Sequence, residues 1–175
     1  FSSSNEYSDC TDFFETTALC KDNVAFLGET FSQGLLFTDN KLSSVVLHTE
    51  YTDELFQKLC LSLPNNNFMC VAIQDSEETI DVLDYLKKNG RNALMTMLFE
   101  YGQQLEDKSD ITFTYVEVSP EMKNIKSIQE LIMTMPENNR GIDMSIIDEE
   151  DSSFIELSFT MPKKELQSMT KKESF

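Results

Sequence analysis

Apolar and polar residues alternate strictly in two stretches near the C-terminal end of the chain. Apolar side chains occupy every second position at Ile142, Met144 and Ile146, and again at Ile155, Leu157, Phe159 and Met161. A period of two is typical of strands that bury one face. The polar stretch DEEDSS, residues 148–153, connects the two stretches, so the pattern predicts an antiparallel hairpin.

Apolar residues at helical spacing predict helices in the middle of the chain. Thr52 is a suitable N-cap for a helix over 53–63, in which apolar residues share one face and which a proline ends. Asp75 and Glu78 form a pattern like a capping box at the start of a helix over 77–88. An Asn-Gly pair ends that helix, and a second one is predicted over 91–106.

Another helix is predicted after Ser119 and Pro120, which have the residue types of an N-cap and a first helical position. Its apolar residues at helical spacing are Ile125, Ile128, Leu131, Ile132 and Met135. The methionine-containing stretches ALMTMLF (93–99) and LIMTM (131–135) fit core filling, with the lining of a promiscuous binding groove as the alternative.

Strands are predicted over 42–48, 68–73 and 111–118, where β-branched and other apolar residues predominate. Before them the pattern is least regular, with a short helix in DFFETTALC and short strands or loop in VAFLG and GLLF. We therefore expect an irregular N-terminal arm, residues 1–41, and an α/β domain, residues 42–175. In that domain a mixed sheet flanked by helices ends in an antiparallel hairpin and a C-terminal helix that begins with PKKELQSM.

The order of these elements resembles that of a thioredoxin-like fold. The segments ITFTYVEVSPEM, GIDMSIIDEE, SFIELSFTM and PKKELQSM would be its second-half strand and helix, its hairpin and its closing helix. No catalytic C-x-x-C is present, and no proline directly precedes the strand that starts at Ile142. The resemblance therefore implies a non-catalytic thioredoxin-like domain of the kind found in lumenal folding factors, where such domains are binding or spacer modules.

The cysteines Cys10, Cys20, Cys60 and Cys70 form two pairs with nine residues inside each. Zinc sites need closer pairs such as C-x₂₋₄-C, and thiol redox sites usually need C-x-x-C. Two disulfides are therefore expected, with four buried thiols as the alternative. The spacing permits two short loops, but we favour links from the first pair to the second, which would tie the N-terminal arm to the sheet.

Acidic residues outnumber basic residues by 31 to 14, which gives a formal charge of −17. Because this charge repels phosphate backbones and anionic lipids, neither nucleic acid nor a membrane surface is expected as a partner. The acidic surplus serves solubility or attracts a basic protein partner. No apolar run reaches the roughly 18–20 residues of a membrane span. A start at Phe1 instead of methionine fits a removed signal sequence or excision from a larger chain.

Residue types that carry catalysis are scarce. His48 is the only histidine, and it lies at a strand end where a partly exposed polar role is expected. The sequence contains no G-x-S-x-G nucleophile elbow and no glycine-rich phosphate loop. DEEDSS lacks the central glycine and ligand spacing of an EF-hand calcium loop. We therefore assign no catalytic residue, no metal ligand and no cofactor.

These patterns favour a non-enzymatic protein-binding module, secreted or in the lumen of the endoplasmic reticulum, that uses its acidic surface or an exposed edge strand. One alternative is an enzyme with a carboxylate- or cysteine-based site; another is a cytoplasmic acidic regulatory or inhibitor protein. An enzyme should show a deep pocket with converging carboxylates of perturbed pKa, whereas a binding module should show a flat or grooved apolar patch.

Overall fold

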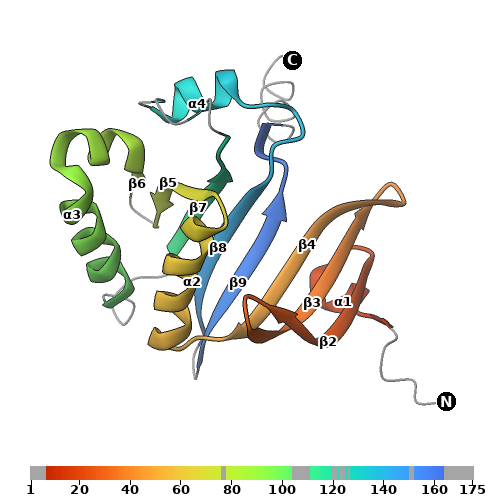
Figure 1. Cartoon of the computed structure of the whole chain (residues 1–175). Coiled ribbons are helices and arrows are strands. Elements are labelled where there is room, and N and C mark those ends of the chain that lie inside the picture. Colours follow the sequence, from red (N-terminus) through yellow and green to blue (C-terminus); the bar gives the residue numbers. More distant parts are fainter. Residues whose placement is uncertain are drawn as a thin grey trace.

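The protein is built on one large antiparallel sheet. The structure, a computed structural model, describes residues 7–75, 78–103, 111–119, 122, 125, 127–149 and 152–163. Nine strands lie in the order β1-β2-β3-β4-β9-β8-β7-β5-β6, and every neighbouring pair is antiparallel (Figure 1). The fold is thus mainly β, and the predicted α/β class with a thioredoxin-like arrangement is wrong.

The bounds of the elements show how much of the described chain is extended. The strands are β1 (Ser8–Asp9), β2 (Ala18–Phe26), β3 (Glu29–Thr38), β4 (Lys41–Glu50), β5 (Phe68–Gln74), β6 (Thr79–Asp81), β7 (Ile111–Glu117), β8 (Gly141–Glu149) and β9 (Ser152–Thr160). The helices are α1 (Thr11–Phe14), α2 (Asp53–Asn65), α3 (Val82–Gln103) and α4 (Ile128–Thr134).

Two connections explain why the alternation of strands and helices did not give the predicted sheet. α2 joins β4 to β5, but β9, β8 and β7 lie between those strands in the sheet. α3 joins β6 to β7, and the short hairpin of β5 with β6 adds a reversal of the chain before the helix. β7 therefore pairs antiparallel to β5, whereas a single helical crossover between two strands would make them parallel.

The irregular conformation expected for residues 1–41 is wrong for the described part of that segment. β2 and β3 pair along most of their length, and β3 pairs with β4, so the sheet continues from residue 18 to residue 50. The sequence of β2 lacks a clean alternation because a bulge interrupts it between Lys21 and Val24. The register of β3 with β4 also shifts after Leu36, where Ser43 is the extra residue on β4. A bulge adds one residue and shifts the alternation from one face to the other.

Five predicted elements are confirmed. The strands predicted over 42–48, 68–73 and 111–118 correspond to β4, β5 and β7, and the C-terminal hairpin corresponds to β8 and β9. The helix predicted over 53–63 is α2, and its N-cap Thr52 accepts a hydrogen bond from the backbone N–H of Leu55 at 3.1 Å. The proline expected to end it, Pro64, instead lies inside the helix, which ends at Asn65.

The helix predicted over 77–88 begins later than its capping pattern indicates. The Asp75 carboxylate does accept the backbone N–H of Glu78, but this contact closes the turn between β5 and β6. The helix begins at Val82, where Asp81 accepts the N–H of Asp84 at 3.0 Å. At Gly90 the backbone has φ 82°, which divides α3 into the two predicted helical parts.

The helix predicted from Ser119 also begins later, at Ile128. Ser127, and not Ser119, is the N-cap of α4, and its hydroxyl accepts the N–H of Glu130 at 3.2 Å. Met135 is the C-cap of α4, and Pro136 follows it. Of the predicted C-terminal helix, only Pro162 and Lys163 belong to the described residues.

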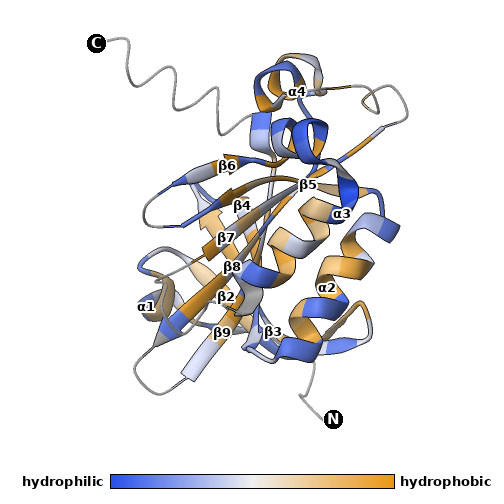
Figure 2. Cartoon of the chain, turned by 90° about the vertical axis from the view of Figure 1, so that its left-hand side faces the viewer, coloured by the Kyte–Doolittle hydropathy of each residue, from blue (hydrophilic) through white to orange (hydrophobic). Residues whose placement is uncertain are grey.

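The two faces of the sheet are covered differently. α2 and α3 cover the face that we call the covered face (Figures 1 and 2), where they enclose the larger hydrophobic core. Alternation along the strands places Phe113, Tyr115, Met144, Ile155 and Leu157 on this face, each at most 1% exposed. The opposite face, here called the open face, carries a smaller cluster under α4 that includes Val71, Val116, Leu131 and Met135.

Candidate functional site

Polar side chains cross the middle of the open face in two rows, each set by strand register. In the first row Thr114, Asp143 and Ser158 are neighbours on β7, β8 and β9. The second row runs through Thr112, Ser145, Glu156, His48 and Ser32, on β7, β8, β9, β4 and β3. Except for the exposed Ser32, these side chains are half-buried, so the open face presents a polar band next to the apolar cluster under α4.

A groove lies between α4 and the open face, with a volume of about 330 Å³. Leu131 and Ile132 of α4 and its C-cap Met135 line the groove. Sheet residues also line it, among them Val71, Val116, Thr114 and Asp143. In the stretch LIMTM, Leu131 and Met135 are buried in the smaller hydrophobic cluster, as core filling predicts, and they also line the groove together with Ile132.

The floor of this groove depends on the absence of a side chain at Gly141. A Cβ atom at this position would lie 2.8 Å from Cγ of Pro162 and 3.0 Å from Oγ1 of Thr160. Both neighbours line the groove, so β8 and the segment after β9 approach each other closely here. Any larger residue would push Pro162 away from the groove.

Among the residues that the structure describes, Asp143 is the only acidic one that lines the groove. The Thr114 hydroxyl donates a hydrogen bond of 2.8 Å to Oδ1 of Asp143. Burial raises the pKa of the Asp143 carboxyl above its ordinary value of 3.8, and the Thr114 hydrogen bond lowers it in part. The ionised carboxylate is therefore held in an environment that favours its neutral form.

Asp143→Asn is expected to raise the free energy of unfolding at pH 7 by up to about 1 kcal/mol, because it removes a half-buried charge and keeps an acceptor for Thr114. A carboxyl whose pKa is higher in the folded state binds protons more readily there, so wild-type stability falls as pH rises above 3.8. The advantage of the variant should therefore vanish as pH falls to that value. Urea unfolding of both proteins between pH 3.5 and pH 7 tests this.

The control is Asp148→Asn, which removes an exposed carboxylate from the same strand. It changes the net charge equally but should leave stability within about 0.5 kcal/mol. A loss of stability in Asp143→Asn at pH 7 would show instead that Asp143 holds the fold together.

Glu156 is the second half-buried carboxylate on the open face. Burial raises its pKa, and the neighbouring His48 lowers it in part. Glu156 does not line the groove with Asp143, because the two residues stand in different rows. The groove therefore does not bring two carboxylates together as an acid–base pair would require.

His48 lies between Ser32 and Glu156 in the second row, an order that resembles a serine–histidine–acid arrangement. The contacts do not fit that chemistry. The Ser32 hydroxyl donates to Asp22 at 2.7 Å, and the His48 ring stacks on Phe154 with centroids 4.7 Å apart. A serine nucleophile instead needs its proton directed at the imidazole, so His48 fits the expected polar role.

Among the described residues, no group of three or more His, Cys, Asp or Glu side chains could hold a metal ion. Within that same part of the chain, no helix is long and apolar enough to cross a bilayer.

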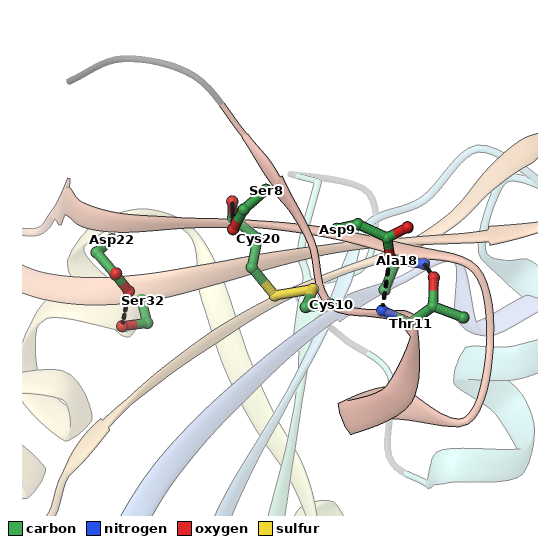
Figure 3. The surroundings of a disulfide bond; sticks show 8 residues. All are labelled: Ser8, Asp9, Cys10, Thr11, Ala18, Cys20, Asp22 and Ser32. Carbon is green, nitrogen blue, oxygen red and sulfur yellow. Dashed lines mark hydrogen bonds between the residues drawn. A yellow bond between two sulfur atoms is a disulfide. The ribbon is translucent and has the colours of Figure 1, made fainter. Parts of the chain in front are cut away.

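Cys10 and Cys20 form a disulfide with a Cα–Cα distance of 5.8 Å (Figure 3). β1 pairs with β2, and the Cys10 N–H donates to the Ala18 carbonyl at 3.1 Å. The Thr11 hydroxyl accepts the Ala18 N–H at 3.3 Å, so α1 begins beside β2 (Figure 3). The favoured links between the two pairs of cysteines are therefore wrong, and the first short loop is the one that forms.

Cys60 and Cys70 are free thiols in the core between α2 and β5. The Tyr115 hydroxyl donates to Sγ of Cys60 at 3.8 Å, and Tyr115 pairs with Cys70 across β7 and β5. Burial raises the pKa of Cys60 to about 11, against a small lowering by the Tyr115 hydroxyl, and burial also raises the pKa of Cys70. These thiols fit the alternative of core packing and not a reactive site.

Iodoacetamide at pH 7.5 is expected to modify neither Cys60 nor Cys70 in the folded protein, because Cys60 is half-buried, Cys70 is buried, and burial raises the pKa of both thiols. Intact mass should show no adduct in buffer, two adducts in urea, and four in urea with a reductant. Any adduct in the folded protein would contradict the inert role. Fewer than two adducts in urea alone would show that a second disulfide exists.

Sequence reasoning missed Asp143 and Thr114 as site residues. Asp143 sits between Ile142 and Met144 in the alternating stretch, so the pattern placed it on the polar face of its strand. Its burial arises from α4 and from the strands on either side, which no local pattern reveals.

A scan against protein-family models and searches of curated proteins and of solved structures gave no match.

Proposed function

We propose that this chain is a non-enzymatic protein-binding module that holds a segment of a partner protein against the open face of its sheet. The observation that carries the proposal is the groove below α4, with apolar walls and one half-buried carboxylate. Protein-binding sites combine an apolar centre with a few polar groups at the rim. The grooved apolar surface matches the property that was expected to distinguish a binding module from an enzyme.

The proposal includes a basic partner in an oxidising compartment. A formal charge of −17 favours encounter with positively charged surfaces. The Cys10–Cys20 disulfide is typical of secreted proteins and of the lumen of the endoplasmic reticulum, since cytoplasmic thiols are kept reduced. These two features support a secreted or lumenal module with a basic partner.

Selection of a random dodecapeptide display library on the folded protein tests the proposed binding. Selected peptides are then crosslinked to two variants with benzoylphenylalanine, one at Gln74 and one at Leu61. Gln74 is exposed at the rim of the groove, whereas Leu61 is 55% exposed on α2, which packs against the covered face.

Crosslinks at Gln74 and none at Leu61 are the expected result. A library without enrichment over an unrelated acidic protein of similar charge would overturn the proposed function. Enriched peptides that crosslink only at Leu61 would overturn the assignment of the open face.

A further inference from the structure

We infer that the groove below α4 selects a lysine side chain of the partner, whose aliphatic stem packs between α4 and the sheet while its ammonium group binds Asp143. This inference rests on the proposed protein-binding function and adds the chemistry that the groove recognises.

The walls of the groove match the stem of such a side chain. Leu131, Ile132 and Met135 line the groove together with Val71 and Val116 of the sheet, so a chain of methylene groups would lie along an apolar surface. Lysine commonly buries its stem along apolar surface while its charged end reaches a polar group. The volume of about 330 Å³ is at the lower end of the range for ligand pockets, roughly 300–1,000 Å³, which suits one long side chain.

Asp143 lacks a cationic partner among the described residues. Arg140 precedes the groove residue Gly141, but its guanidinium binds the Glu117 carboxylate through two nitrogens. Lys163 follows the groove residue Pro162, but its ammonium donates to the Met135 carbonyl at 2.7 Å. These two described cations, which adjoin groove residues in sequence, are thus engaged elsewhere, and among the described residues no cation occupies the Asp143 carboxylate.

The geometry of Asp143 favours lysine over arginine. Oδ1 already accepts the Thr114 hydroxyl at 2.8 Å. A guanidinium binds best when both oxygens of a carboxylate receive its parallel N–H groups, whereas an ammonium is a point charge that needs one oxygen. The Thr114 hydroxyl takes one of the two acceptor positions of Oδ1, so the carboxylate accommodates a single ammonium contact more readily than two parallel N–H groups.

The ionised Asp143 carboxylate is expected to lower the stability of the free protein and to strengthen binding of a lysine side chain. The raised pKa of Asp143 reflects an ionised form that is poorly solvated in the free protein. A bound ammonium would supply the missing counter-charge, and it would do so only while the carboxyl is ionised. Affinity for the lysine side chain should therefore fall as pH drops towards 3.8.

The test uses three blocked tripeptides, acetyl-leucyl-X-leucine amide, in which X is lysine, arginine or norleucine. Norleucine keeps most of the aliphatic stem and removes the charge. Titrations followed by ¹H–¹⁵N NMR measure the affinity of each for the wild-type protein and for Asp143→Asn, with Asp148→Asn as the charge-matched control. The thermal midpoint and amide spectrum of each variant establish that it is folded.

We expect the lysine peptide to bind roughly 10- to 100-fold more tightly than the norleucine peptide, and Asp143→Asn to remove that preference. Asp148→Asn should retain it. Thr114→Val frees Oδ1 and should raise the affinity of the arginine peptide relative to that of the lysine peptide.

Two results overturn the inference and separate it from the proposed function. If display-selected peptides bind at the groove but lysine and norleucine bind equally, or Asp143→Asn keeps the preference, the lysine assignment fails and the binding module stands. If neither tripeptides nor display-selected peptides bind, the lysine assignment and the proposed protein-binding function fail together.

Discussion

Phe113→Ala is expected to lower the free energy of unfolding by about 3–5 kcal/mol, a large share of the roughly 5–15 kcal/mol that stabilises a domain. Phe113 is fully buried at the centre of β7 on the covered face. Its ring lies 5.4 Å from that of Phe56 on α2, and its strand neighbours are Ile73 and Met144. Because α2 and two strands hold these neighbours in place, the cavity that the missing Phe113 ring leaves cannot collapse.

Urea unfolding at pH 7 measures this effect, and Thr112→Ala is its matched control. Thr112 is the preceding residue on the same strand, so it points to the open face, where its hydroxyl lies 2.9 Å from that of Ser145. Loss of this half-buried contact should cost about 1 kcal/mol or less. Equal losses in both variants would contradict the assignment of covered and open faces.

Phe113 and Thr112 are adjacent in sequence but lie on opposite faces of the sheet, and this difference shows what the sequence could predict. Along β8 and β9, alternation predicted which residues share a face, and the structure confirms the pairing of β8 with β9. The alternation cannot show which strand lies beside which when the connection is long. β4 pairs with β9, more than 100 residues later, and this pairing joins the N-terminal strands to the C-terminal hairpin.

The capping patterns were recognisable, but their context was not. Asp75 makes the backbone contact that a cap makes, in a turn between two strands. The same chemistry serves both structures, because an Asp side chain satisfies an N–H three residues on in either case. The site was hidden for a related reason: Asp143 and the α4 residues of the groove come together only through the packing of α4 on the sheet.

Reduction of the Cys10–Cys20 disulfide, or its replacement in Cys10→Ser/Cys20→Ser, is expected to have the second largest effect. The chain-entropy relation gives roughly 2.5–3 kcal/mol for a loop of 10 residues. Outside the disulfide, β1 pairs at two positions, and Phe14 of α1 lies against Gly34 on the open face. None of these residues belongs to the core under α2 and α3.

Loss of the disulfide should therefore first destabilise the N-terminal strands around it and only then the whole fold. Hydrogen exchange should quicken at the amides of Cys10 and Ala18 by about 10- to 100-fold, while amides of β7 and β8 keep the protection of the intact core. Treating the wild-type protein with a reductant should reproduce the double variant, since its remaining cysteines are free thiols. If the reductant further destabilises the double variant, Cys60 and Cys70 are bonded as well. If exchange in β7 rises as much as at Ala18, the N-terminal strands and the core unfold as one unit, and the disulfide stabilises the whole sheet, including the surface that we propose binds the partner.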